Sequence, residues 1–201
     1  MVKRGNGRVY DCVAIDLNTQ TDFCVPNGAY PVANLEEVIP ALRRVIAWTK
    51  WHGLPVVSSL DSHRPCDLPN EDGPMHCVDG SHGQHKIPFT LFGRLTQVEV
   101  DNTLSIPLNL FNQYQQVLFR MRTDDLLANP KADRFLTQVS AAEFVVFGNT
   151  VEHSVKALVL GLVGRNKSVT VVQDACGYWN RGAADLAFRQ MIAKGCRLTT
   201  V

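Results

Sequence analysis

The feature that most constrains this chain is the alternation of short apolar segments with amphipathic segments along its 201 residues. The apolar segments have the length of strands, and the segments between them carry apolar residues at helical spacing. The expected strands are 9–16, 55–59, 115–121, 144–148, 168–173 and 197–201, and the expected helices are 34–52, 130–139, 151–164 and 182–194. This alternation predicts a three-layer α/β/α fold, in which helices cover both faces of a mainly parallel sheet.

Local signals support several helix boundaries. Asn34 is a favourable N-cap for the helix 34–52, and Gly53 is a favourable stop. Pro130 suits the first turn of the helix 130–139, because proline at that position loses no backbone hydrogen bond.

Length and charge limit the classes of function. We expect one domain over residues 1–201, because a chain of this size can bury one full hydrophobic core. Lys plus Arg total 20 and Asp plus Glu total 19, so no strong field favours nucleic acid or an anionic membrane as a partner. We find no signal peptide, no apolar run of about 18 residues, and no zinc-finger spacing among the six cysteines. We therefore expect reduced thiols in a cytoplasmic protein.

The long segment 60–90 is the first candidate for function, because ligands of such folds bind beyond the carboxyl ends of the strands. Asp61 and His63 lie two residues apart after a strand, so both side chains can point to one side. His76 could complete the set, with Glu71 or Asp67 as a fourth ligand. Two histidines with carboxylates suit a divalent metal such as zinc, iron or manganese. The alternative is a solvated loop whose histidines bind nothing.

A hydroxyl stands at a second strand end. Ser154 lies in the first turn of the helix 151–164, where the helix field cannot ionise a hydroxyl at neutral pH. A nucleophilic serine needs an adjacent base. His153 is a poor partner, because consecutive helical residues point about 100° apart. Taken alone, Ser154 is a helix-end hydroxyl.

Six segments, in this order, resemble motifs of the isochorismatase-like cysteine hydrolases, most closely of the nicotinamidase branch. They are NTQTDFCVPNGAYPV, SLDSHRP, GPMHCVDGSHG, LLANPKADRFL, VVFGNTVEHSVKALVLGL and VTVVQDACG, and the similarity runs from residue 13 to residue 200. The resemblance implies a Rossmann-type α/β/α fold and amide hydrolysis by an Asp, Lys and Cys triad. Isochorismatases use a related site to cleave a vinyl ether.

At all three triad positions that the resemblance implies, this chain has a different residue type from the family. The Asp of the family's DxQxDF motif corresponds to Asn18, the Lys to Met121 and the Cys to Ser154. Asn is not a base at neutral pH, Met carries no charge, and Ser without a base is a weak nucleophile. Three such changes together predict that thiol-based amide hydrolysis has been lost.

Two alternatives for these positions stay open. Asp16 could replace the base, although members with DVDTQxDF carry an acid at both places, so Asp16 matches the upstream one. Arg120 or Arg122 could stand where the family has its lysine.

The metal positions match the resemblance better. It implies Asp61, His63 and His76 as ligands, with Glu71 the best fourth and Asp67 the alternative. The expected ligand pocket contains Phe23, Asn149, Thr150 and Trp179.

We therefore expect a catalytically degenerate member of the family that binds a small molecule or a protein partner. The alternative is an active amidohydrolase with a rearranged or metal-dependent site. We expect no nucleic-acid and no membrane partner, and the resemblance implies a homo-oligomer.

Overall fold

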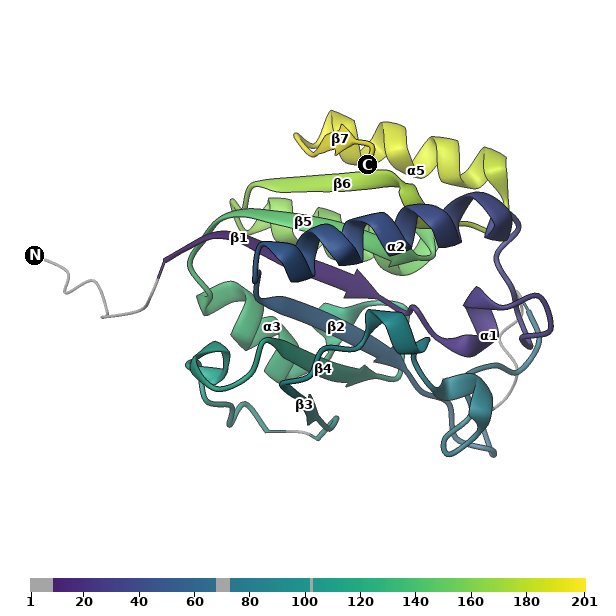
Figure 1. Ribbon diagram of the computed structural model, residues 1–201, viewed down its shortest axis with the longest axis horizontal. Coiled ribbons are helices and arrows are strands. Elements are labelled where there is room, and N and C mark those ends of the chain that lie inside the picture. The colour runs from purple at the N-terminus through teal and green to yellow at the C-terminus, as the bar shows by residue number, and fades with distance from the viewer. Residues whose placement is uncertain (1–8, 68–72, 102) are drawn as a thin grey trace, which may run out of the picture.

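A seven-stranded parallel sheet forms the centre of the computed structural model, which describes residues 9–67, 73–101 and 103–201. The strands are β1 (Tyr10–Leu17), β2 (Val56–Asp61), β3 (Leu95–Val98), β4 (Gln116–Met121), β5 (Ala141–Asn149), β6 (Val169–Gly177) and β7 (Arg197–Thr199). Their order in the sheet is β3-β4-β2-β1-β5-β6-β7 (Figure 1). Every pairing is parallel, as the predicted alternation requires.

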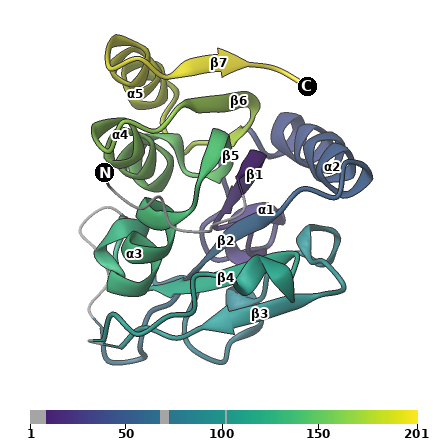
Figure 2. The ribbon, with the colours of Figure 1, turned by 90° about the vertical axis from the view of Figure 1, so that its left-hand side faces the viewer.

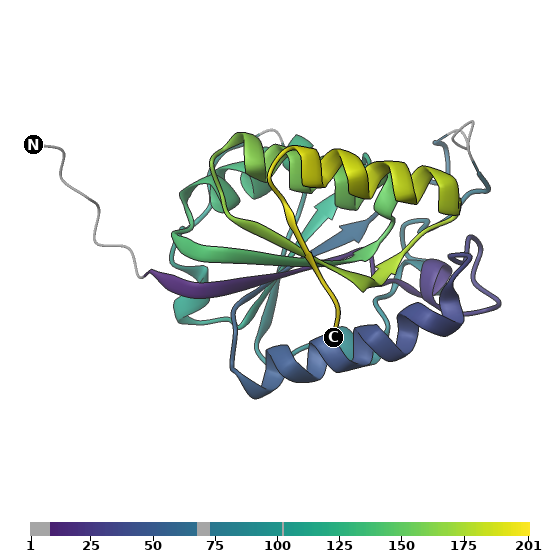
Figure 3. The same ribbon diagram turned by 90° about the horizontal axis from the view of Figure 1, so that it is seen from above.

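Helices cover both faces of this sheet. Helix α2 (Leu35–Trp51) lies on one face, and α3 (Pro130–Gln138), α4 (Lys156–Gly164) and α5 (Arg181–Ala193) lie on the other. Figure 3 shows the same three layers from above, with the sheet between α2 and α5. The short helix α1 (Thr21–Cys24) follows β1 at the carboxyl edge of the sheet. The predicted three-layer α/β/α class is confirmed.

Strand β1 lies at the centre of the core. Residues 13–17 have no measurable exposure, because helices cover β1 on both faces. Parallel strands buried on both faces have nearly continuous apolar sequences. Asp16 interrupts the apolar run of β1 while being fully buried, so it requires a partner inside the protein.

The topology also predicts where a ligand binds. Strands β2, β4 and β3 lie on one side of β1, and β5, β6 and β7 lie on the other. The connections therefore diverge beside β1, and such switch points create a crevice at the carboxyl ends of the strands.

Three local features differ from the sequence expectations. Strand β3 was not predicted, because half of its side chains are exposed at the edge of the sheet and its sequence lacks an apolar run. The expected helix 151–164 begins as a π-helical turn, Val151–Val155, before α4. Asn34 does not cap α2 with its side chain, which instead donates to the Cys176 carbonyl and accepts from the Tyr178 N–H.

Two further observations concern all the described residues. None of the described helices is long and apolar enough to cross a membrane. All six cysteines are free thiols.

Candidate metal centre and the adjoining polar site

Four chemically distinct residues lie along the carboxyl edge of the sheet. Asn18 follows β1, Asp61 ends β2, Met121 ends β4, and Ser154 lies in the π-turn after β5. Asp61 and Met121 are paired in register across β2 and β4. Residues far apart in sequence therefore meet at the crevice that the topology predicts.

Asp61, His63 and His76 form one compact cluster. One potential ligand atom from each lies within 4.8 Å of the other two. The Asp61 Oδ2 atom is 3.2 Å from Nε2 of His63 and 3.4 Å from Nε2 of His76. One carboxylate oxygen thus faces two imidazole nitrogens.

The turn after β1 holds Asp61 in place. The Gln20 side chain donates to the Asp61 carbonyl at 2.9 Å and accepts from the Asp61 N–H at 2.8 Å. This paired contact fixes the backbone at the end of β2. The glutamine of the NTQTDF segment is therefore a structural clamp for a metal-ligand candidate.

Asp22 of the same segment positions the loop that carries His76. Its Oδ2 atom accepts the Cys77 N–H at 2.7 Å, directly beside His76 in the chain. A Cβ atom at Gly83 would lie 2.1 Å from this carboxylate, so only glycine allows the close approach.

Hydrogen bonding orients the His76 ring. Its Nδ1 atom lies 2.8 Å from the Pro74 carbonyl, which can only accept a hydrogen. Nδ1 therefore donates to this carbonyl, which leaves Nε2, the atom that faces Asp61, as the potential metal ligand. Metal-ligating histidines commonly have this second contact.

Charge coupling within the cluster is visible in its pKa values. Burial by itself would raise the pKa of Asp61, but hydrogen bonds from His63 and His76 outweigh it and hold that pKa below its ordinary value. The hydrogen bond to Asp61 raises the pKa of His63. Opposite charges favour each other's ionised form at this distance.

The donor set fits a divalent metal. Two imidazole nitrogens and a carboxylate oxygen are ligands of zinc, iron and manganese sites. Among the described residues the cluster does not include Asp67, whose Oδ2 atom accepts the Arg64 N–H at 2.6 Å. Glu71 lies outside the described residues.

Asn18 and Ser154 are in direct contact. The Asn18 Nδ2 atom lies 3.1 Å from Ser154 Oγ, and both residues are buried. Ser59 holds the other end of the amide: its hydroxyl donates to Asn18 Oδ1 and accepts the Asn18 N–H at 2.9 Å. Asn18 has a φ of +46°, which asparagine tolerates better than most residues.

Met121 is not part of this contact. It is 1% exposed and belongs to the hydrophobic core, two strands away from β1. The neighbouring Arg120 and Arg122 both reach Asp79, at 3.3 and 2.7 Å. Neither arginine makes a hydrogen bond to Asn18 or Ser154 within the described chain.

The structure places Asp16, the alternative base, in a buried ion pair. Its Oδ2 atom lies 2.9 Å from Nζ of Lys86, and both side chains are almost completely buried. Ser58 donates to the same oxygen at 3.1 Å, and Thr19 donates to the other at 2.8 Å. Asp16 is thus the acidic half of a buried ion pair.

Aromatic rings lie beside His76 of the candidate metal site. The centroid of the Phe23 ring is 5.2 Å from that of His76 and 5.8 Å from that of Trp179. The Tyr30 ring stacks on Trp179 at 3.9 Å and is 5.5 Å from His76. Two predicted pocket residues, Phe23 and Trp179, therefore lie close to the predicted metal ligands.

The two other predicted pocket residues lie beside Asn18. Asn149 donates to the Asn18 carbonyl at 3.1 Å and to Cys24 Sγ at 3.2 Å, while its own Oδ1 atom is buried and has no partner among the described residues. Thr150 is buried and precedes the π-turn. Burial raises the pKa of the Cys24 thiol to about 12, so this thiol is protonated at neutral pH.

Sequence reasoning missed three residues of this region. Ser59 and Lys86 organise the polar network, and Tyr30 completes the aromatic wall. A charged residue within an apolar run, Asp16, was the available sign of a buried partner. No local pattern identifies that partner as Lys86.

The match to a protein-family model covers residues 12–201, and the model is the isochorismatase domain. A nicotinamidase of Escherichia coli (strain K12) is 26% identical over 211 residues, which cover 92% of each protein. A pyrazinamidase of Pyrococcus horikoshii in complex with zinc superimposes with a TM-score of 0.74 at 18% identity, over 95% of this chain and 99% of that one.

A third comparison is PnC1 from L. infantum in complex with nicotinate. It superimposes with a TM-score of 0.70 at 17% identity, over 94% of this chain and 92% of that one. At such identities the superpositions establish the shared fold.

Proposed function

The chain belongs to the isochorismatase family, and from this premise we propose that it is a member without thiol-based amide hydrolysis, which binds a small planar ligand beside a divalent metal. The contact between Asn18 and Ser154 is the observation that carries the proposal.

The orientation of the Asn18 amide determines the role of Ser154. The Ser59 hydroxyl occupies Asn18 Oδ1, so the amide presents its N–H group to Ser154 Oγ. The Ser154 oxygen therefore accepts a hydrogen bond from Asn18, and Asn18 does not take the hydroxyl proton of Ser154. Attack on a carbonyl requires the opposite, a base that removes the hydroxyl proton.

Other nearby groups do not supply this base. Nδ1 of His153 lies 3.1 Å from Asp124, on the outer side of the π-turn. Lys86 is paired with Asp16, and its remaining contact is with the Ser59 carbonyl at 3.3 Å. The Cys24 thiol has a pKa of about 12 and cannot substitute as a ready thiolate.

The metal cluster and the rings support a binding role. Asp61, His63 and His76 would hold the metal, and Phe23, Tyr30 and Trp179 would contact the faces and edges of a planar ligand. The relatives in complex with zinc and with nicotinate support this class of metal and ligand.

A second candidate is a metal-dependent amidohydrolase. The observation that favours it is the three-ligand cluster, which leaves room for further ligands on a metal. A metal bound there would supply Lewis acidity toward an amide carbonyl.

The test is ammonia release from nicotinamide and a panel of small amides, with and without zinc, manganese or iron. The native protein is compared with His63→Ala, Ser154→Ala and a triple variant, Asn18→Asp, Met121→Lys and Ser154→Cys. We expect no release from the native protein and measurable release from the triple variant, because the fold and pocket would be retained. Circular dichroism confirms that each variant folds.

Two outcomes would overturn this proposal. Metal-dependent turnover by the native protein that is lost in His63→Ala would establish the second candidate. Turnover that survives His63→Ala but is lost in Ser154→Ala would show that Ser154 is an active nucleophile.

A further inference from the structure

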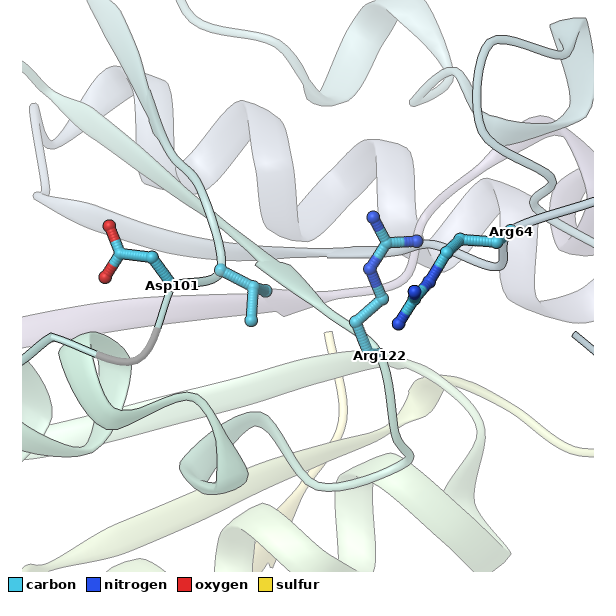
Figure 4. Close-up of a pocket in the computed structure, with 4 residues that line it drawn as sticks. Arg64, Asp101 and Arg122 are labelled. Atoms are coloured by element: carbon cyan, nitrogen blue, oxygen red, sulfur yellow. The ribbon is translucent and has the colours of Figure 1, made fainter.

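A cavity lies next in the chain to the candidate metal ligand His63 and to Met121. Its volume is about 510 Å³, and its walls are Arg64, Val100, Asp101 and Arg122. Arg64 directly follows His63, and Arg122 directly follows Met121 at the end of β4. Figure 4 shows the two arginine side chains extending toward one another, with Asp101 on the far side.

Arg122 is held in a defined position. One of its terminal nitrogens donates to Asp79 at 2.7 Å and lies 3.3 Å from the Ser62 carbonyl. The backbone N–H of Asp79 donates to the His63 carbonyl at 2.8 Å, so the same acid lies beside the metal cluster. Nε and the second terminal nitrogen of Arg122 make no hydrogen bond with the described residues, although a guanidinium offers five N–H groups.

Arg64 has more freedom. Its side chain is 65% exposed, and within the described ranges it makes one ion pair, a contact of 3.9 Å between Nε and Asp67. Asp67 itself is occupied by the Arg64 backbone N–H. Among the described residues the Arg64 guanidinium makes no hydrogen bond, so its N–H donors are available to a ligand.

The acids around the cavity already have partners. Asp101 accepts from Lys131 at 2.5 Å and from the Thr103 hydroxyl at 2.7 Å. Asp79 is shared between Arg120 and Arg122. Glu99 contacts Arg120 at 3.1 Å. Arg64 and Arg122 line the same cavity, and neighbouring positive charges favour an anion.

We propose that Arg64 and Arg122 bind an oxyanion, a carboxylate or a phosphate, carried by the small molecule whose planar part reaches the metal cluster. This inference rests on the proposed function only for the planar part of the ligand, which would reach Asp61, His63 and His76. Guanidinium groups suit such anions, because their planar N–H forks match two oxygens at once. The native ligand is then an anionic compound, unlike a neutral amide such as nicotinamide.

The test is isothermal titration calorimetry of the protein with inorganic phosphate and, separately, with benzoate. The protein is kept free of metal, so that neither anion can bind to a metal ion instead of to the arginines. We expect at least one anion to bind, and to bind about tenfold more weakly to Arg64→Gln and to Arg122→Gln, because each removes a charge-assisted contact. Arg44→Gln is the matched control: this exposed arginine lies on α2 and should leave affinity unchanged. Phosphate binding without benzoate binding identifies a phosphate ligand, and the reverse identifies a carboxylate.

The inference is overturned if neither anion binds, or if Arg64→Gln binds as tightly as the native protein. Arg64 is exposed, so its variant keeps the test decisive even if Arg122→Gln fails to fold. A parallel zinc titration separates the two proposals: zinc binding without anion binding removes only the oxyanion site, whereas loss of zinc binding counts against the proposed metal centre.

Discussion

Single side chains decide the chemistry of this site more than the fold does. Asn18 and an aspartate have nearly the same shape, yet the amide donates a hydrogen to Ser154 where a carboxylate would accept one. Ser59 enforces this orientation from the other end of the amide. A change of one functional group thus reverses the direction of a hydrogen bond at the site.

His153 offers a test of local electrostatics beside Ser154. The hydrogen bond to Asp124 raises the pKa of His153 above its ordinary value. We expect Asp124→Asn to lower the pKa of His153, measured by NMR titration of its ring protons, whereas Asp185→Asn on α5 should leave it unchanged.

The same pair has a predictable effect on stability. The pKa of His153 is raised in the folded state. The pair's contribution to the free energy of unfolding is therefore complete below the unfolded-state pKa of about 6.5, and it is lost as the pH rises through the folded-state pKa. Asp124 is exposed and His153 is partly exposed, so solvent screening keeps the effect below about 1 kcal/mol. An unchanged His153 pKa in Asp124→Asn would show that the pair does not form in solution.

The turn after β1 illustrates how one segment organises several others. Gln20 clamps the end of β2, and Asp22 clamps the loop before Val78. Asp16, at the end of β1, pairs with Lys86 from the segment between β2 and β3. The motif residues Gln20 and Asp22 therefore position the candidate metal ligands and are not part of that cluster themselves.

The buried pair of Asp16 and Lys86 predicts a large effect on stability. Lys86→Met leaves Asp16 charged and uncompensated, and we expect the free energy of unfolding to fall by about 3–5 kcal/mol in urea denaturation. The double variant with Asp16→Asn should lose less than the sum of the two single variants.

Arg44→Met is the control for this experiment. The exposed pair of Arg44 and Asp174, 3.7 Å apart, should contribute less than about 1 kcal/mol. If Lys86→Met destabilises the protein no more than Arg44→Met does, the buried pair is not a structural element of the native state.

The candidate metal centre is a property of the whole molecule, because its potential ligands come from two separate segments that the fold brings together. A ligand that binds only the folded state stabilises it. Zinc at a hundredfold excess over its Kd should add about 2.7 kcal/mol and raise Tm by roughly 5–10 °C.

Scanning calorimetry with and without zinc measures this shift. His63→Ala and His76→Ala should abolish the shift, and His52→Ala, an exposed residue beyond α2, should retain it. A shift that persists in His63→Ala and His76→Ala would place the zinc elsewhere, for example on cysteine thiols.

The sequence by itself determined the α/β class, the order of most strands and helices, and the strand ends that carry the candidate functional side chains. These follow from periodicity, which is a local property of the chain. It also identified Asp61, His63 and His76 as a group, because the first two stand two residues apart after a strand and the third lies on the loop that follows. It did not predict β3, whose edge position leaves half of its side chains in solvent.

Only the tertiary structure decided how these groups are paired. It joined Asp16 to Lys86 and turned the Asn18 amide toward Ser154. It also placed Arg64 beside Arg122. Such pairings depend on the positions and orientations of side chains up to 136 residues apart, which no local pattern encodes. The physical reason is that a buried polar group must find its partner in space, and the packed sheet determines which partner is there.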